Sequence, residues 1–175
     1  LTSPGEGEVL VRTLILSQDA ANRAWMQGAT YRSALSSGQV MSSGGIAEVV
    51  ESNSERFKVG QIVSGDLGWQ EYAVIPGHQL SPVTDHKGPS SHSLSLLGVA
   101  GLTAYHGLIN VPGIHAGEVL LVSAAGGSVG SIVGQIGRIK GAKVIGIAGG
   151  TEKCQWVVDE LGFDACLDYK DTSAP

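Results

Sequence analysis

The sequence predicts an α/β protein in two parts, a β-rich part followed by a strand–helix–strand part. Short runs of alternating apolar and polar residues, separated by glycines, recur over residues 8–74, which is typical of a small barrel or sandwich. In the second half the apolar spacing becomes helical. A glycine turn there follows a short β-branched run at residues 119–122. We therefore expect two domains, residues 1–92 and residues 93–175.

The first part is expected to hold four strands joined by glycine turns. Strands are predicted over residues 8–17, 46–52, 61–66 and 69–74. A short helix over residues 19–26, capped by Ser17 or Asp19, follows the first strand. Residues 27–39 are polar and contain glycine, which indicates a surface loop. Residues 76–91 form a connector rich in Pro, Gly and His.

The second part begins with a helical pattern over residues 93–109, capped by Ser91 or Ser93. Its three glycines lower helix propensity but permit close packing against another backbone or a ligand. Further elements are expected as a strand over 119–122, a helix over 129–139, a strand over 143–147, a helix over 152–161 and a last strand before Lys170. This order is that of a doubly wound domain.

The glycine turn carries the main functional signal, reading AGGSVG at residues 125–130. Without a Cβ atom, Gly127 lets the backbone approach a pyrophosphate, and Gly130 lets the helix pack closely on the strand. The helix N-terminus then offers unpaired N–H groups and a positive dipole end to phosphates. These features predict a dinucleotide site that includes Ala125, Gly126 and Val129, with Ala125 in place of the usual first glycine. The alternative is a turn that only packs a helix on a sheet.

The end of the next strand indicates which dinucleotide is bound. An enzyme that prefers NAD places Asp or Glu there to bind the ribose diol. Gly149 and Gly150 occupy this place, and Lys153 can offer a positive charge to the 2′-phosphate of NADP. The sequence therefore favours NADP, bound in part by Gly149 and Lys153. Two alternatives stay open: Lys153 is an ordinary solvated lysine, or Glu152 binds the ribose hydroxyl and restores NAD.

Composition narrows the class of protein. A net charge of -5 without a basic patch argues against nucleic acid as a partner. No apolar run reaches the length of a membrane span. Cys154 and Cys166 are too few for a disulfide framework and are expected to be small residues with free thiols, which fits a cytoplasmic location. Because a doubly wound domain needs more than three strands, we expect the chain to be part of a longer protein.

Several motifs resemble those of one family. They read SQDAANR at residues 17–23, GWQEY at 68–72, LGVAGLTAYHGL at 97–108, VSAAGGSVGS at 122–131 and GIAGGTEKC at 146–154. Their order resembles that of the medium-chain dehydrogenase/reductases. The closer resemblance is to the zinc-independent branch that includes leukotriene B4 dehydrogenase/prostaglandin reductase and the NADPH-dependent alkenal double-bond reductases. It extends over nearly the whole chain.

This resemblance implies a GroES-like β-rich catalytic domain followed by the first half of a Rossmann NADP-binding domain. It also implies that Lys153 and Tyr169 hold the 2′-phosphate of NADP and that Thr103 lies near the nicotinamide. Ala20 and Asn22 depart from the family, which favours Pro and Met at these two positions near the substrate.

No metal is expected in the first part. It contains no cysteine, and residues 43–45 read Ser-Gly-Gly where the zinc-dependent branch carries Gly-His-Glu. The histidines are His78, His86, His92, His106 and His115, and none is at ligand spacing from a cysteine. They are interpreted as surface or capping residues. Without a Lewis acid, alcohol oxidation lacks its usual means of stabilising an alkoxide.

Reduction of an activated carbon–carbon double bond needs no metal. We therefore expect an enzyme that uses NADPH to reduce α,β-unsaturated aldehydes or ketones, with small enals or enones as its partners. A hydrogen-bond donor would stabilise the enolate oxygen, and Tyr31 is the candidate catalytic residue. The alternative for Tyr31 is a loop aromatic that packs over the cleft. Alternatives for the protein are an NADPH quinone reductase and a non-catalytic NADP-binding protein, and a homodimer is a further expectation.

Overall fold

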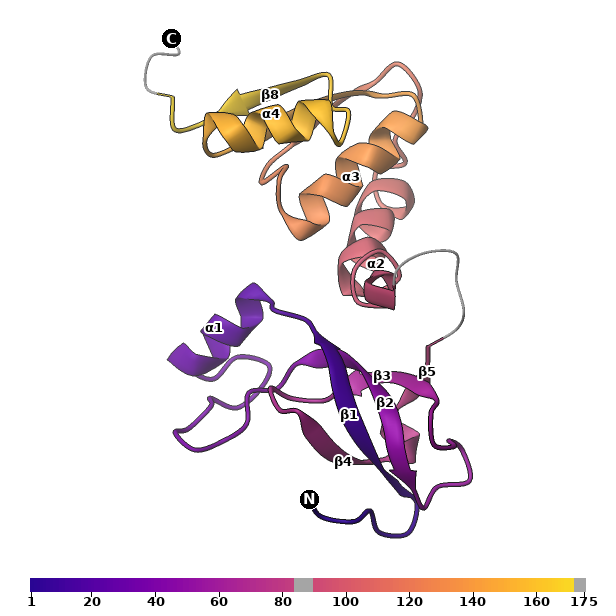
Figure 1. Ribbon diagram of the computed structural model, residues 1–175. Helices are drawn as coiled ribbons and strands as arrows, with labels where there is room; N and C mark the ends of the chain where they lie inside the picture. Colours follow the sequence, from indigo (N-terminus) through magenta and orange to yellow (C-terminus); the bar gives the residue numbers. More distant parts are fainter. Residues whose placement is uncertain (84–89, 172–175) are drawn as a thin grey trace. The chain divides into compact units, whose positions relative to one another are not determined.

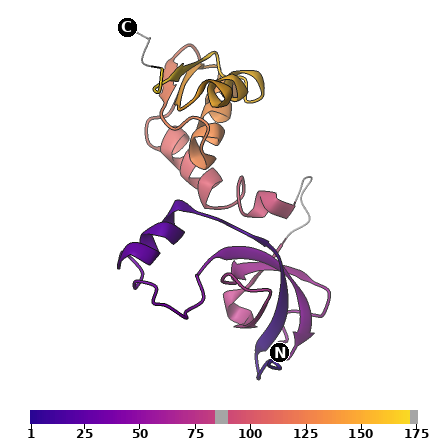
Figure 2. The ribbon, with the colours of Figure 1, turned by 60° about the vertical axis from the view of Figure 1, so that its left-hand side comes forward.

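A computed structural model describes residues 1–83 and 90–171 of the chain. It divides into two compact units, Leu1–Leu94 and Ser95–Pro175, which we describe separately. Figures 1 and 2 show the helices and strands of each unit. Part of the predicted connector, residues 84–89, lies outside the described residues.

The first unit is built on one antiparallel sheet with the strand order β4-β1-β2-β3-β5. Its strands are β1 (Glu8–Leu16), β2 (Gly44–Ser52), β3 (Ile62–Asp66), β4 (Tyr72–Pro76) and β5 (Ser81–Pro82). The first three confirm the predicted strands. The fourth begins later than predicted, because Gln70 N–H turns back to donate to the carbonyl of Gly68 at 2.9 Å. The predicted connector also contains a 3-10 turn at Gly77–Gln79 and the short strand β5, which pairs with β3.

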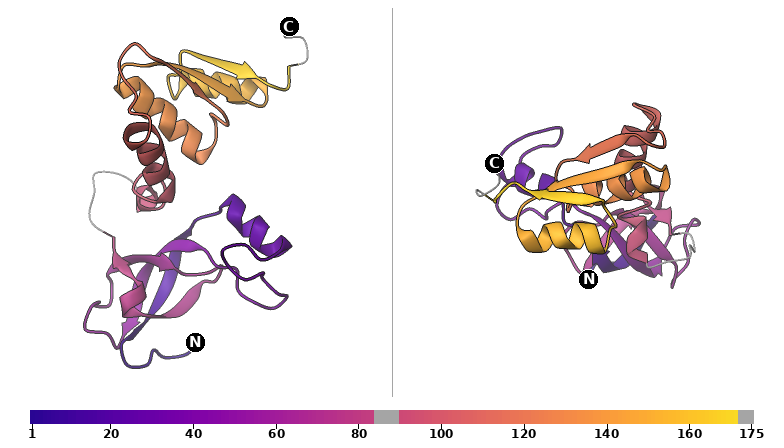
Figure 3. Two further views of the ribbon diagram at one scale, coloured as in Figure 1. Left: turned by 180° about the vertical axis from the view of Figure 1, so that it is seen from behind. Right: turned by 90° about the horizontal axis from the view of Figure 1, so that it is seen from above.

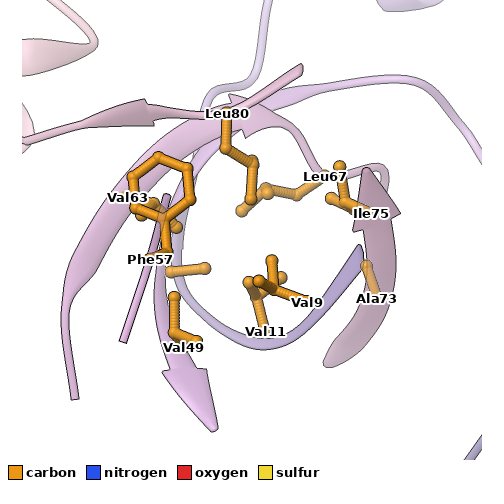
Figure 4. Close-up of a cluster of buried hydrophobic side chains, with 10 residues drawn as sticks. Val9, Val11, Val49, Phe57, Val63, Leu67, Ala73, Ile75 and Leu80 are labelled. Atoms are coloured by element: carbon orange, nitrogen blue, oxygen red, sulfur yellow. The ribbon is translucent and has the colours of Figure 1, made fainter. Parts of the chain in front are cut away.

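The single sheet of the first unit curls around an apolar core (Figure 4). It thereby encloses the core in the way that was expected of a small barrel or sandwich. The core consists of Val9, Val11, Ala47, Val49, Phe57, Val63, Leu67, Ala73, Ile75 and Leu80. Strand alternation directs the strand residues of this core to one face of the sheet, and Phe57, Leu67 and Leu80 join them from the connecting segments. Complete burial of one such aliphatic side chain contributes about 1.5–3 kcal/mol, so this core accounts for the closure of the sheet.

A short helix, α1 (Ala20–Gln27), follows β1. Its N-cap residue is Asp19, one of the two predicted caps. The backbone N–H of Asp19 donates to Oδ1 of Asn22 at 2.7 Å. The side-chain amide of Asn22 donates to the carbonyl of Ser42 at 3.0 Å, and only 4% of Asn22 is exposed. Asn22 therefore joins the helix to the loop that leads into β2, and its polar atoms are satisfied.

The helix that opens the second unit is shorter than predicted. The structure has a 3-10 turn at Ser90–Ser93, then α2 (Val99–Tyr105) and a π-helical turn (His106–Asn110). The helix begins after Gly98, so the prediction of a cap at Ser91 or Ser93 was wrong. Gly101 explains this start, because a Cβ atom there would lie 1.8 Å from the carbonyl oxygen of Leu96. The preceding residues fold back onto the helix at a distance that only glycine permits.

The rest of the second unit alternates strands and helices, which confirms the α/β class. A parallel sheet in the order β6-β7-β8 consists of β6 (Val119–Val122), β7 (Lys143–Ala148) and β8 (Ala165–Asp168). The crossover helices are α3 (Ser128–Ile139) and α4 (Thr151–Asp159). Both pack on the same face of the sheet (Figure 3), as right-handed crossovers between successive neighbouring strands require.

The core of the second unit lies between this sheet face and the two helices. It contains Val122, Ala125, Val144, Val157 and Phe163. Gly134 in α3 faces the ring of Phe163 closely, since a Cβ atom there would lie 1.8 Å from the Cζ atom. The opposite face of the sheet carries Leu121 and Leu167, which are 59% and 58% exposed.

Candidate functional site

The turn after β6 is tighter than the sequence motif alone indicates. Ala124 has a φ of 48°, a left-handed conformation that residues other than glycine rarely adopt. Its carbonyl accepts a hydrogen bond from Gly127 N–H at 2.8 Å. Ala125, in contrast, is fully buried beneath the turn and contributes its side chain to the core. The sharp reversal is therefore made by Ala124, the residue before the first motif position, and sequence reasoning missed it.

The predicted role of Gly130 has a clear geometric basis. A Cβ atom there would lie 2.4 Å from the carbonyl oxygen of Ala124, so only glycine lets α3 approach the turn this closely. Gly127 is the N-cap residue, and among the described residues no side chain caps this helix. A hollow of about 470 Å³ lies before the helix N-terminus, and its lining includes Gly127, Ser128, Val129 and Gly130. Backbone N–H groups and the helix dipole make this place suitable for a phosphate.

A second hollow, of about 360 Å³, lies at the carboxyl ends of β6 and β7. It is lined by Ser123, Ala124, Gly126, Gly127, Ile147, Ala148, Gly149, Lys153 and Tyr169. Five of the residues that the sequence singled out, Gly126, Gly127, Gly149, Lys153 and Tyr169, therefore lie around one space. They come from the turn, the end of β7, the start of α4 and the segment after β8.

Two glycines in this hollow make room for the side chains of Lys153 and Tyr169. A Cβ atom at Gly126 would lie 2.8 Å from both Cγ and Cδ of Lys153, so the lysine stem lies across the glycine turn. At Gly149 a Cβ atom would lie 2.6 Å from the Tyr169 hydroxyl oxygen. The cationic side chain and the phenol thus occupy positions that a larger residue at either glycine would block.

Asp168 anchors the start of α4 and was missed by sequence reasoning. Its carboxylate accepts hydrogen bonds from Gly150 N–H at 2.8 Å, Lys170 N–H at 3.0 Å and the Thr151 hydroxyl at 3.4 Å. The bond from Gly150 N–H is the main reason why the pKa of Asp168 lies below its usual value, and the bond from Lys170 N–H adds to it. Asp168 thereby holds the first turn of α4, from which Lys153 extends.

We expect Asp168→Asn to lower the thermal midpoint of unfolding near pH 7, because the amide is a weaker acceptor than the carboxylate. A carboxyl group whose pKa is lowered by folding stabilises the protein above its unfolded pKa, and this contribution is lost as the pH falls through the folded pKa. The difference between variant and parent should therefore shrink below about pH 4. Thermal unfolding followed from pH 3 to pH 7 checks this, and a difference that is the same at every pH would contradict it.

The alternative that Glu152 binds the ribose hydroxyl is compatible with the position of Glu152. A third hollow, of about 510 Å³, is lined by Gly126, Gly149, Gly150, Glu152, Lys153 and Trp156. Glu152 and Lys153 therefore border the same space at the start of α4. Trp156, which sequence reasoning did not single out, adds an aromatic surface that is 43% exposed. Its spacing of three residues from Lys153 could have indicated a shared helix face.

Thr103 and Tyr31 belong to different units. Thr103 is exposed on α2, a helix that packs against α3. Tyr31 belongs to the first unit, is 80% exposed, and meets the ring of Trp25 edge to face with centroids 6.0 Å apart. Within the second unit, Thr103 does not line the three hollows described above.

The loop that carries Tyr31 is fastened to the sheet through Asp66. Its carboxylate accepts hydrogen bonds from Arg32 at 2.9 Å, from the Ser42 hydroxyl at 2.5 Å and from Ser43 N–H at 2.9 Å. Partial burial alone would raise the pKa of Asp66, but the bonds from Ser42, Arg32 and Ser43 outweigh it and lower the pKa. The ion pair with Arg32 holds the residue next to Tyr31 against the end of β3.

Two further properties of the described residues bear on the site. In residues 1–83 and 90–171, no three His, Cys, Asp or Glu side chains gather closely enough to hold a metal ion. In the same residues, no helix has both the length and the apolar character that crossing a bilayer requires.

Comparison with known proteins agrees with this geometry. The family described as the N-terminal domain of oxidoreductase matches residues 1–83. The NADPH-dependent curcumin reductase of Escherichia coli (strain K12) is 45% identical over 97% of this chain and 49% of its own length. The prostaglandin reductase 1 of Bos taurus is 41% identical over 94% of this chain and 49% of its own length. The chain thus spans about half the length of these curated relatives.

Solved structures give the same result. The crystal structure of CurA from Vibrio vulnificus matches with a TM-score of 0.89 and 42% identity, covering 98% of this chain and 51% of that one. The chain is similar to curcumin, prostaglandin and 2-alkenal reductases over about half of their length, which confirms the resemblance of its motifs to the zinc-independent medium-chain dehydrogenase/reductases.

Proposed function

We propose that the protein uses NADPH to reduce the carbon–carbon double bond of α,β-unsaturated aldehydes or ketones. The observation that carries this proposal is a hollow in which Lys153 lies against the glycine turn. In the same hollow Tyr169 lies beside Gly149, which occupies the place where an acidic residue would select NAD. Relatives described as NADPH-dependent curcumin reductase and NADP(+)-dependent 2-alkenal reductase support it.

The residues of this chain are suited to the cofactor in two places. The N-terminus of α3, with Gly127, Val129 and Gly130 beside it, suits the pyrophosphate. Lys153 offers a charge, and Tyr169 a hydroxyl, for the 2′-phosphate. A second crystal structure of CurA from Vibrio vulnificus, 41% identical to this chain, is a complex with NADPH. The negative charge of Glu152 alone would disfavour the 2′-phosphate of NADP. The opposing charges of Glu152 and Lys153 therefore set the preference between NADP and NAD together.

The reaction requires a donor for the substrate oxygen. NADPH held by the N-terminus of α3, Lys153 and Tyr169 would supply the hydride for the β-carbon of the enone, and negative charge would then develop on the carbonyl oxygen of the substrate. A positioned hydrogen-bond donor contributes about 3–4 kcal/mol to such a transition state. Tyr31 is our candidate donor, because the residue is 80% exposed while its ring meets that of Trp25 edge to face. Thr103 is proposed to lie beside the nicotinamide.

We assign roles to the two expected domains. Residues 1–92 would form the GroES-like domain that binds the substrate, and residues 93–175 would begin the domain that binds NADP. The partner would be a small enal or enone. We also propose a cytoplasmic location, where the free cysteines Cys154 and Cys166 would stay reduced, and a homodimer as the assembly.

Quinone reduction is the second candidate, because solved quinone oxidoreductases have the same fold. The one from Pseudomonas syringae matches with a TM-score of 0.65 and 26% identity. We expect the full-length enzyme to oxidise NADPH with a 2-alkenal at a kcat/KM at least about tenfold above that with a benzoquinone, a difference of about 1.4 kcal/mol in transition-state stabilisation. Loss of NADPH absorbance at 340 nm, measured with each substrate, checks this.

The control is the same assay without enzyme, since quinones accept electrons from NADPH slowly on their own. A higher kcat/KM for the quinone would replace the proposal by the second candidate. If NADPH raised the thermal midpoint but neither substrate were turned over, the protein would be a non-catalytic NADP-binding protein.

A further inference from the structure

Two cysteine side chains meet between α4 and β8. The Sγ atoms of Cys154 and Cys166 are 3.1 Å apart, with the Cys166 thiol donating to Cys154. A disulfide bond has a sulfur–sulfur distance of about 2.05 Å, so an approach of about 1 Å would join them. Cys154 is 8% exposed, and Cys166 is partly buried against the same core. Both thiols are free.

The pair belongs to a seam that holds the start of α4 on the end of β8. Asp168 makes the neighbouring contacts of this seam, through Gly150 N–H and the Thr151 hydroxyl. Cys154 directly follows Lys153, and Cys166 lies two residues before Asp168. A covalent bond between the cysteines would therefore fasten the turn of α4 that carries the proposed 2′-phosphate ligand.

Small molecules can reach the pair. A hollow of about 590 Å³ is lined by both cysteines together with Thr151, Gln155, Val158, Leu167, Asp168 and Asp171. This space is separate from the hollow that holds Tyr169, since it opens on the seam between α4 and β8. An oxidant of the size of hydrogen peroxide can thus enter without passing the cofactor site.

We propose that Cys154 and Cys166 form an intramolecular disulfide when the protein is exposed to a peroxide. The thiolate of Cys166 attacks one peroxide oxygen, the O–O bond breaks, and hydroxide leaves and takes up a proton to give water. Cys154 then attacks the resulting sulfenic sulfur, the S–O bond breaks, and a second water leaves. Two thiols and one hydrogen peroxide thereby give one disulfide and two waters, with both sulfurs oxidised and both peroxide oxygens reduced.

The environment of Cys166 makes this oxidation slow at neutral pH. Burial, followed by the hydrogen bond to Cys154, raises the pKa of Cys166 to about 12. Asp168 on β8 and Asp171 after it are the charged groups that line the hollow, and α4 contributes Cys154 with the uncharged Thr151 and Gln155. Because only the thiolate reacts, the initial rate should rise by about tenfold for each pH unit between pH 7 and pH 9.

One tryptic peptide contains both cysteines, which makes the test direct. Residues 154–170 have no Lys or Arg before Lys170, and Lys153 precedes them. The full-length protein is treated with hydrogen peroxide, quenched, alkylated with iodoacetamide under denaturing conditions and digested with trypsin. We expect this peptide to carry no alkyl group and to have two hydrogens fewer than the unalkylated dithiol peptide. Dithiothreitol before alkylation should restore both alkyl groups.

A peptide that still carries two alkyl groups after peroxide would overturn the proposal. So would sulfinic or sulfonic acid at either cysteine, or a disulfide to another chain. None of these readouts involves NADPH, so the result is independent of the proposed activity.

Unfolding supplies a second measurement with a matched control. The bond joins cysteines 12 positions apart in the sequence, and cross-linking such a loop should raise the thermal midpoint by roughly 5 °C. Cys166→Ser keeps the size of the side chain but cannot form the bond, so peroxide should leave its midpoint unchanged. An equal rise in the Cys166→Ser variant would assign the effect to other residues and contradict the proposal.

Discussion

Replacing Lys153 by alanine is expected to weaken NADPH binding by about tenfold to hundredfold, since a hydrogen bond between charged groups contributes about 1.5–3 kcal/mol. The lysine stem lies across Gly126 at the edge of the hollow, which directs its ammonium group to the space expected for the 2′-phosphate. NADH lacks that phosphate, so its affinity should change by less than about twofold. Fluorescence titration with both reduced cofactors measures the two dissociation constants.

Lys170→Ala is the matched control for this experiment. It removes the same charge near Tyr169, but Lys170 is exposed and does not line the hollow. Its effect on NADPH should therefore be small, about twofold or less, as for an exposed charge screened by salt. If Lys153→Ala weakened NADPH and NADH equally, Lys153 would have a general structural role and the assignment of the 2′-phosphate site would fail.

Gly134→Ala is expected to destabilise the second unit strongly. The added Cβ atom would lie 1.8 Å from Cζ of Phe163 and 2.2 Å from its Cε1, which is far inside van der Waals contact. Phe163 is only 2% exposed and is held by the core, so its ring cannot swing away. Overpacking of this kind costs about 1–3 kcal/mol. Chemical denaturation followed by circular dichroism should show a lower midpoint for the variant.

Gly107→Ala provides the comparison. It is also a glycine in a helical turn of the second unit, but a Cβ atom there meets nothing within 4 Å. Its midpoint should equal that of the parent or rise slightly, because alanine favours helix over glycine. Equal destabilisation by Gly134→Ala and Gly107→Ala would show that the contact with Phe163 does not control stability.

Much of the fold follows from short-range patterns. Alternation predicted β1, and the spacing of apolar residues predicted α3, because each depends on which face of an element is buried. The helix of the second unit was predicted to begin at residue 93 but begins at Val99. This start depends on the contact of Gly101 with Leu96, and apolar spacing does not reveal such a return of the backbone.

Some residues of the candidate site could likewise be predicted from the sequence, and others could not. Gly127 and Lys153 could be proposed from sequence, because a phosphate cradle and an opposing charge have recognisable residue types and spacing. Asp168 and Ala124 could not, since their roles arise from hydrogen bonds between segments and from a left-handed backbone. The contact of Cys154 with Cys166 likewise depends on how α4 is rotated about its own axis against β8.

The packing of Lys153 on Gly126 and of Tyr169 beside Gly149 has an evolutionary consequence. In each pair, a mutation that enlarges the glycine displaces its partner, so the two positions cannot drift separately. Among descendants of this gene, loss of either glycine should be accompanied by replacement of the matching lysine or tyrosine, and with it by a change of coenzyme.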